Sequence, residues 1–554
     1  MKKIPILIVI VVVATVFSAC RQADDQDFLQ AEAVINGEAM AEYIKVLASD
    51  EFAGRKPFTV GEELTIAYLQ QQFIELGLEP AFSGSYFQEV PLMEVEVKPA
   101  ETMRLAAETG GLVLNNLTDF VAFSRKVKPK TVIENAAMVF AGYGIVAPEY
   151  QWDDYYGLDV RDKIVVVLVN DPGLATGNPD LFNGNAMTYY GRWTYKYEEA
   201  ARHGARGILI VHNTLGAGYP WSVVVSGAVS PKLFLHDEGG YSEFADIEGW
   251  LTTEAAVELF GNAGFDFKQM TEEAANPGFR AVDLKTRLWF EMGSTFKYDV
   301  SRNVAGVMPG TDLADEVIIF SCHWDHFGIG PVINGDSIYR GAVDNGTTMA
   351  WMLEIARAFG KLENRPRRSI MFLAPTAEEQ GLLGAHYYVK NPAFPLEKTV
   401  ANLNNDLMLP LGRMRDVMIT GYGQSTLDDL VEEAAKRQDR YVVPDPNPET
   451  GMYYRADHFA FAKVGVPALF ARGNVEHREH GREWMAQKEK DWLANNYHKP
   501  ADKYDAETWD MEGIVEDAKL AFFIAWKLAG SNEWPQWKEG SEFKAVRESY
   551  LRAD

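Results

Sequence analysis

The strongest constraint on the fold is an alternation of strand-like and helix-like segments after Arg302. Short apolar runs end in polar loops, and each loop leads to a longer amphipathic segment. Strands that alternate with helices indicate a mostly parallel sheet covered on both faces. The sequence therefore predicts an α/β fold, with strands at 316–321, 368–375, 399–407 and 416–420 and helices at 347–359, 382–389 and 426–437.

A different pattern occupies residues 134–290. This region holds apolar runs punctuated by Gly and Pro, such as "DKIVVVLVND", and residues 195–212 are typical of a helix, a glycine turn and a strand. We expect a β-rich module here, inserted into a larger domain formed by 27–133 and 291–545. In the first of these parts, Thr59 and Glu62 have capping-box spacing and predict a helix that Gly77 ends.

The N-terminus indicates export. "MKK" and the apolar run after it form the charged and hydrophobic regions of a secretory signal, which we assign to residues 1–20. The run ends in "VFSAC", which resembles the bacterial lipobox except that Phe17 stands where leucine is usual. The resemblance implies a lipid on Cys20 and attachment to a membrane of the bacterial cell envelope, facing the periplasm or the exterior. A plain membrane anchor and an ordinary signal peptide are the alternatives.

Composition excludes some functions and leaves most open. The 554 residues carry a formal charge of −26, which argues against a nucleic-acid or anionic-membrane binding surface. With Cys20 lipidated, Cys322 is the single remaining cysteine and cannot form an intramolecular disulfide. We interpret Cys322 as a buried structural thiol and not as a nucleophile. His477 and His480 in "VEHREHGRE" are interpreted as part of a solvated segment.

Histidines and carboxylates stand where the predicted strands end. Functional residues gather at the carboxyl ends of strands in such sheets, and imidazole with carboxylate suits zinc and similar ions. Each residue alone has a structural interpretation, as a core histidine, a helix cap or a turn residue, but their joint placement favours a metal site. The candidates are His323, Asp325, Asp344, Glu378, Glu379, Asp406 and, far downstream, His498.

The segments that carry these residues resemble the ordered motifs of the M28 family of zinc aminopeptidases. They are "CHWDHFG", "GAVDNGT", "PTAEEQGLLGAH", "NLNNDLM", "RADHFAFAKVGVPALF" and "YHKPADKYD". Segments within 142–171 and 187–212 resemble the protease-associated (PA) domain. The resemblance implies a zinc-exopeptidase (phosphorylase/hydrolase-like) fold, with residues 27–133 and 291–545 as the peptidase domain and 134–290 as an inserted PA domain.

The resemblance also implies a pair of zinc ions as the cofactor. Asp344 would bridge the two ions. His323 and Glu379 would complete the protein ligands of one ion, and Asp406 and His498 those of the other.

Other residues would then act on the substrate or support the metal ligands. The resemblance makes Glu378 the general base, and Tyr497 a residue that helps to hold the oxyanion. Asp325 would orient the imidazole of His323. Asp457 matches an aspartate of the family's Ser-Asp-His motif, but Ala456 replaces its serine.

The function expected from these residues is an exported zinc exopeptidase acting on peptides. Carboxylates near the motifs outnumber cations, of which Arg340 and Arg455 are the plainest, so we expect release of N-terminal residues. The alternatives are an M28-type carboxypeptidase, a glutaminyl-cyclase-like transferase with one zinc, and a non-catalytic binding protein on this fold. Oligomeric state and the preferred side chain are left open.

Overall fold

The structure is a computed structural model that describes residues 25–236 and 244–551. The chain divides into two compact units: unit 1 comprises the chain up to Val90 with 300–445 and 456–554, and unit 2 comprises 91–299 and 446–455. The predicted signal segment, with Cys20, lies outside the described residues. Among the helices that are described, none combines the length and the apolar character needed to cross a membrane.

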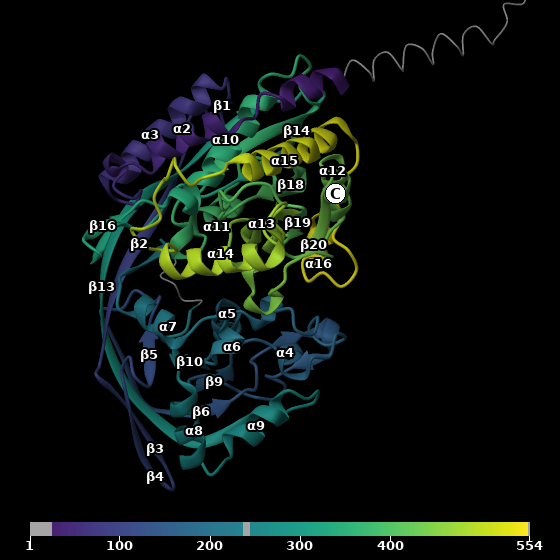
Figure 1. The fold of residues 1–554 in the computed structure, drawn as a ribbon. Helices are drawn as coiled ribbons and strands as arrows, with labels where there is room; N and C mark the ends of the chain where they lie inside the picture. The colour runs from purple at the N-terminus through teal and green to yellow at the C-terminus, as the bar shows by residue number, and fades with distance from the viewer. Residues whose placement is uncertain (1–24, 237–243, 552–554) are drawn as a thin grey trace, which may run out of the picture. The chain divides into compact units, whose positions relative to one another are not determined.

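Unit 1 is built on a mixed sheet with the strand order β1–β13–β17–β14–β18–β21–β19–β20. Figure 1 labels β14, β18, β19 and β20 of this sheet. The four central strands, β17, β14, β18 and β21, are parallel, which confirms the predicted α/β class. The bounds are β1 Glu79–Pro80, β13 Val282–Met308, β14 Leu313–Ser321, β17 Arg368–Ala374, β18 Thr399–Asn404, β19 Asp416–Ile419, β20 Tyr441–Pro444 and β21 Ala468–Arg472; β15 Gly328–Ile333 and β16 Asp336–Tyr339 form a separate hairpin.

Both faces of the central strands are covered by helices. Phe320 of β14 stacks on Phe372 of β17 with ring centroids 5.4 Å apart, and Trp351 of α10 packs against Phe320 at 5.7 Å. Neighbouring residues of a strand point to opposite faces, so Met371 faces the other way. There Tyr388 of α11 donates a hydrogen bond to the Met371 sulfur at 3.5 Å. The sheet is therefore buried on both sides, as its apolar strands require.

The helices of unit 1 agree with the predicted segments. Thr59 caps α3 by accepting a hydrogen bond from the Gly61 backbone N–H, and Gly77 follows the helix end with φ +73°. A left-handed residue of this kind commonly ends a helix. The bounds are α2 Gly37–Leu47, α3 Val60–Glu75, α10 Thr348–Phe359, α11 Leu383–Lys390, α12 Leu427–Arg437, α13 His458–Lys463, α14 Gly481–Asn495, α15 Glu512–Gly530 and α16 Lys544–Leu551.

Unit 2 contains a second mixed sheet, with the order β4–β3–β13–β6–β9–β10–β12–β5, and β11 pairs with β2. The strands are β2 Phe87–Pro99, β3 Thr102–Ala107, β4 Gly110–Asn115, β5 Phe120–Phe123, β6 Lys130–Phe140, β7 Val146–Ala147, β8 Trp152–Asp153, β9 Ile164–Leu168, β10 Gly207–Val211, β11 Lys232–Leu235 and β12 Ile247–Leu251. The helices are α4 Pro172–Thr176, α5 Trp193–Arg202, α6 Thr214–Ala217, α7 Trp221–Ala228, α8 Thr253–Asn262 and α9 Phe267–Ala274.

The boundary of the inserted unit differs from the prediction. We expected it to begin at residue 134, but residues 91–133 belong to unit 2. The reason lies in the strand pairing: β3 pairs with β13 of the unit 2 sheet, and β5 pairs with β12. An alternating strand pattern does not reveal which sheet a strand joins. The unit also includes 446–455, a short return segment that the sequence analysis did not separate.

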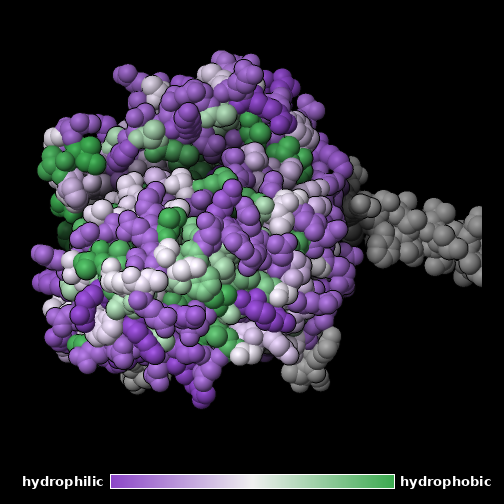
Figure 2. Space-filling model, turned by 90° about the horizontal axis from the view of Figure 1, so that it is seen from below, coloured by the Kyte–Doolittle hydropathy of each residue, from purple (hydrophilic) through white to green (hydrophobic). Residues whose placement is uncertain are grey.

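The face of the molecule shown in Figure 2 is mostly hydrophilic, with hydrophobic residues in separate patches. Asp and Glu number 79 against 53 Lys and Arg. A surface of this kind serves solubility.

Candidate active site

The candidate site lies at one edge of the unit 1 sheet, where three neighbouring parallel strands end. His323 follows β14, Glu378 follows β17, and Asp406 follows β18. The Nε2 atom of His323 lies 3.6 Å from Glu378 Oε2 and 3.4 Å from Asp406 Oδ1. The structure therefore brings together the three residues that the strand ends were expected to supply.

Asp344 occupies the centre of the site. It lies in the irregular helical turn Ala342–Thr347 that precedes α10, and it is 3% exposed. One oxygen of its carboxylate, Oδ1, is 3.4 Å from His323 Nε2, and the other, Oδ2, is 3.3 Å from His498 Nε2. The two histidines thus face different oxygens of one carboxylate, which is the arrangement that a bridging ligand needs.

The remaining ligands divide differently from the expected pairing. His498 Nε2 lies 3.2 Å from Glu379 Oε2, whereas His323 Nε2 lies beside Asp406. The expected pairing of His323 with Glu379, and of His498 with Asp406, is therefore wrong. The geometry groups His323 with Asp406 on one side of Asp344 and His498 with Glu379 on the other.

These separations fit a divalent metal ion. Two ligands held about 2.0 Å from a tetrahedral zinc ion lie about 3.3 Å apart. The four distances from the Nε2 atoms of His323 and His498 to the carboxylates of Asp344, Asp406 and Glu379 are 3.2–3.4 Å. His323 Nε2 and Asp406 Oδ1 are buried and have no hydrogen-bond partner in the part of the chain that the structure describes. Buried polar atoms without partners are costly, so the donor set fits a cation.

Burial and crowding shift the acidities of these groups. Burial raises the pKa of Glu378 well above its usual range, and although His323 lowers it, Asp406 and Glu379 raise it again. Burial acts in the same direction on Asp344, but the His323 and His498 imidazoles hold the pKa of Asp344 well below its usual value. For His498, burial lowers the pKa, and Glu379 and Asp344 outweigh it and raise the pKa to about 10.

Asp325 supports the site in a way that the sequence did not show. Its backbone carbonyl oxygen lies 3.0 Å from His323 Nδ1, while its carboxylate is 3.7 Å from that atom. The carboxylate instead accepts a hydrogen bond from the Glu378 backbone N–H at 3.0 Å. Asp325 therefore contacts the imidazole of His323 chiefly through its main chain, and its carboxylate holds the loop that carries Glu378.

Tyr497 lies directly beside His498, with ring centroids 3.7 Å apart. Burial raises the pKa of the Tyr497 hydroxyl well above its usual value, and Asp344 and Glu379 add to the effect. The hydroxyl therefore keeps its proton and can act as a hydrogen-bond donor.

Four residues of the site were missed by the sequence analysis. His326 is buried and its Nδ1 lies 2.6 Å from Glu379 Oε1. Asp502 accepts hydrogen bonds from the backbone N–H groups of Val343 and Asp344. Arg55 donates to backbone carbonyls of the loops around the site, and Arg472 lies buried at the end of β21. His326 is the second histidine of "CHWDHFG" and Asp502 lies within "YHKPADKYD", so both were visible in the motifs, whereas Arg55 and Arg472 lie outside the quoted motifs.

The remaining sequence expectations have mixed outcomes. Cys322 is fully buried, with its sulfur 3.7 Å from that of Met352, which confirms a structural thiol. His480 is exposed, but His477 is buried and its Nδ1 accepts hydrogen bonds from the backbone N–H groups of Glu479 and His480. The interpretation of that segment as solvated is therefore wrong for His477. Within the described residues, the groups able to hold a metal include neither histidine.

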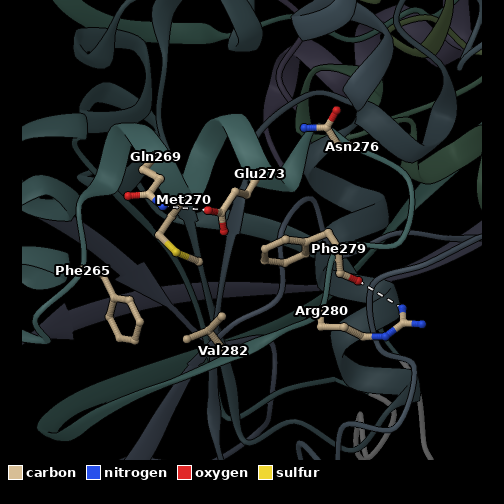
Figure 3. Close-up of a pocket in the computed structure, with 8 residues that line it drawn as sticks. All are labelled: Phe265, Gln269, Met270, Glu273, Asn276, Phe279, Arg280 and Val282. Carbon is tan, nitrogen blue, oxygen red and sulfur yellow. Dashed lines mark hydrogen bonds between the residues drawn. The ribbon is translucent and has the colours of Figure 1, made fainter.

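A pocket of about 520 Å³ on unit 2 carries no comparable chemistry (Figure 3). Its wall is largely apolar, with Phe265, Met270 and Phe279 from α9 and its flanking loops. It includes one carboxylate, Glu273, which accepts a hydrogen bond from Gln269, and it has no histidine. The predicted catalytic and metal-ligand residues all lie in unit 1.

An α/β sheet whose strand ends gather histidines around a shared carboxylate defines a class of metal-dependent hydrolases. Residues 303–523 match the model of Peptidase family M28, so the chain contains an M28 peptidase domain. The fold is shared with the aminopeptidase from Aneurinibacillus sp. strain AM-1, at a TM-score of 0.51 and 19% identity, covering 92% of this chain and 97% of that one.

Two curated relatives match part of this chain. Aminopeptidase NAALADL1 of Mus musculus is 35% identical over 182 residues, which is 30% of this chain and 22% of that protein. The Arabidopsis thaliana protein named "Probable glutamate carboxypeptidase LAMP1" is 31% identical over 200 residues, which is 31% of this chain and 26% of that protein. The chain thus spans about a quarter of the length of each.

Proposed function

We propose that this chain is a zinc-dependent exopeptidase that releases N-terminal amino acids from peptides. The observation that carries the proposal is the spacing of donor atoms around Asp344, with His323 at one oxygen and His498 at the other, each 3.3–3.4 Å away. Asp344, His323 and Asp406 would hold one zinc ion, and Asp344, His498 and Glu379 the second. When bound, zinc would supply Lewis acidity, which polarises a carbonyl group and makes water more acidic.

Glu378 is the proposed proton carrier. Its carboxylate lies near the centre but slightly farther from the ligand histidine than the ligand carboxylates do, at 3.6 Å from His323 Nε2. It takes a proton from the attacking water and gives it to the leaving amine. Its place beside His323 and Asp406 allows the carboxyl group to hold that proton between the two steps. Tyr497, which keeps its own proton, is the proposed hydrogen-bond donor to the developing oxyanion.

The metal content gives the first test. We expect the purified chain to contain two zinc ions, because five protein ligands are more than a single tetrahedral ion accepts. A chelator should abolish peptide hydrolysis, and added zinc should restore it. Elemental analysis measures the stoichiometry. A chain that is fully active with one zinc ion would contradict the two-metal proposal and favour the glutaminyl-cyclase-like alternative.

The preference for the N-terminal end rests on local charge. Besides the ligands, Glu378, Asp325 and Asp457 are buried at the site, and an acidic surrounding suits a substrate ammonium group. Arg340 is one of the two cations that the sequence places near the motifs. It is paired with Asp50 and Asp336 and is not free to hold a substrate carboxylate. Aminopeptidase NAALADL1 and the Aneurinibacillus aminopeptidase carry the same activity in their names.

One buried cation favours the carboxypeptidase alternative. Arg472 is 6% exposed, and its Nε and Nη1 atoms have no hydrogen-bond partner among the described residues. Burial lowers the pKa of Arg472, and the negative charge of Asp406 opposes this effect by favouring the charged form of its guanidinium. A guanidinium with unused donors suits a substrate carboxylate. The Arabidopsis relative is named as a glutamate carboxypeptidase.

An assay on matched substrates separates the two activities. We expect rapid cleavage of an aminoacyl reporter amide and little cleavage of its N-acetylated twin, because acetylation removes the ammonium group. Equal cleavage of both, together with a preference for peptides with a free carboxyl end that Arg472→Met abolishes, would establish the carboxypeptidase instead.

The proposal includes an envelope location and the assignment of unit 2 as a PA domain. The PA assignment rests on the likeness of segments within 142–171 and 187–212 to that domain. The envelope location rests on the "VFSAC" segment, which predicts a lipid on Cys20 and hence membrane attachment. Mass spectrometry of the mature N-terminus is expected to find a lipidated Cys20. An unmodified residue at another cleavage point would contradict the lipoprotein assignment.

A further inference from the structure

His326 differs from the two ligand histidines in how it meets its carboxylate. It lies in the loop between β14 and β15 and is 1% exposed. Its Nδ1 is 2.6 Å from Glu379 Oε1, whereas the other oxygen, Oε2, is 3.2 Å from His498 Nε2. The carboxylate of Glu379 is therefore held between two imidazoles, one at each oxygen.

The two distances indicate different roles. Two ligands of one tetrahedral zinc ion lie about 3.3 Å apart, as Glu379 and His498 do. A separation of 2.6 Å is too short for two such ligands and is typical of a strong hydrogen bond to a charged acceptor. His326 is thus placed as a donor to Glu379, and His498 is the imidazole that would share an ion with it.

The surroundings of His326 fix its ring in this orientation. Its backbone N–H donates to the Arg55 carbonyl at 3.2 Å, and its ring packs edge-on against Phe327 at 5.0 Å. Gly341 lies against the ring so closely that a methyl group there would be 2.7 Å from Cγ and Cδ2. Gly341, Phe327 and the Arg55 carbonyl thus hold His326 where its Nδ1 faces Glu379.

We propose that His326 is a positioning residue that donates from Nδ1 to Oε1 of Glu379 and thereby directs Oε2 toward the metal position shared with His498 and Asp344. The inference rests on the proposed zinc centre and goes beyond it. It makes the two metal positions unequal, because His326 lies against Glu379, a ligand of only one of them.

The experiment measures zinc release from the full-length, zinc-loaded chain after addition of a coloured chelator. We compare His326→Leu, which has no donor, with His326→Asn, whose amide nitrogen occupies nearly the position of Nδ1. Loss of the donor should make one of the two zinc ions dissociate about 10- to 100-fold faster and leave the other unchanged. His326→Asn should release both ions at nearly the parent rates.

Two further variants make the result specific. His480→Leu is the matched control, because His480 is exposed and its ring stacks on that of His477 outside the site. Its zinc release should equal that of the parent. In a His498→Ala background, which removes a ligand of the same ion, His326→Leu should cause no further loss. If His326→Leu does not fold, His326→Gln takes its place, because its amide lies nearer the position of Nε2 and leaves Glu379 without its donor.

The outcomes separate this inference from the proposed function. A parent chain without two zinc ions refutes the metal centre itself. A parent with two ions, in which the donor-free variant releases both faster or neither faster, overturns the role of His326. Equal zinc loss in His326→Asn and His326→Leu does so as well.

Discussion

Replacing Glu378 by glutamine is expected to lower kcat by about 10²- to 10⁴-fold while zinc content and fold stay as in the parent chain. Glutamine has the shape of glutamate but cannot accept the proton of the attacking water. The hydrogen bond that anchors this loop, from the Glu378 backbone N–H to Asp325, does not depend on the side chain. Steady-state kinetics on an aminoacyl reporter amide, with zinc analysis of the same sample, give the measurement.

Glu379→Gln is the matched control, because it is the same change at the adjacent residue. The carboxylate of Glu379 lies 3.2 Å from His498 Nε2, a separation expected for two ligands of one ion. This variant should therefore contain less zinc than the parent chain, as zinc analysis measures directly. Equal zinc loss in the two variants would show that the division between a proton carrier and a ligand is wrong. A Glu378→Gln variant with unaltered kcat would remove Glu378 from the reaction.

The division of roles follows from where the chain places two neighbouring glutamates. Both stand in the short 3₁₀ turn Glu378–Gln380, and their carboxylates diverge, one toward His323 and the other between His326 and His498. A cation beside Glu379 would offset the repulsion between the adjacent charges. The adjacent carboxylates of Glu378 and Glu379 can therefore belong to one site, with Glu379 as a metal ligand and Glu378 as the proton carrier.

The sequence predicted the part of the site that depends on parallel strands. His323, Glu378 and Asp406 each follow an apolar strand, and parallel neighbours end at the same edge of a sheet. Strand and helix patterns were enough to bring them together. His498 follows no strand and lies far downstream, so only the likeness to a known family indicated it.

The pairing of ligands and their supports could not be predicted in the same way. Which oxygen of Asp344 each histidine faces depends on the path of the loop 495–502, and residue spacing holds no information about it. Asp502 and Arg55 form hydrogen bonds with backbone groups. Nearly every residue has a backbone N–H and carbonyl, so the sequence does not indicate which of them these side chains bind. The boundary at residue 91 was missed for a related reason, because strand patterns do not specify partners.

Arg55 carries the second large effect, which concerns stability. Its side chain is fully buried and donates to the backbone carbonyls of Leu47, Trp324 and Gly341, each at 2.9 Å. It also donates to the carbonyl of Arg340. One guanidinium thus joins the end of α2, the loop after β14 and the turn that carries Asp344. Burial lowers the pKa of Arg55 to about 10, although Asp502 and Asp344 favour its charged form, so it remains a cation at neutral pH.

Arg55→Met is therefore expected to reduce the free energy of unfolding by about 3–5 kcal/mol, because several buried carbonyls lose their donors together. Arg55→Lys should recover part of the loss, since an ammonium group carries the charge but cannot reproduce the planar set of donors. Arg302→Met is the control at the surface, where the guanidinium pairs with Glu63 at 2.8 Å, and it should cost no more than about 1 kcal/mol. Urea unfolding of the three variants measures the difference. If Arg55→Met unfolds at the same urea concentration as Arg302→Met, the buried guanidinium does not hold these loops, and the order of the metal site must come from Asp502 and the sheet alone.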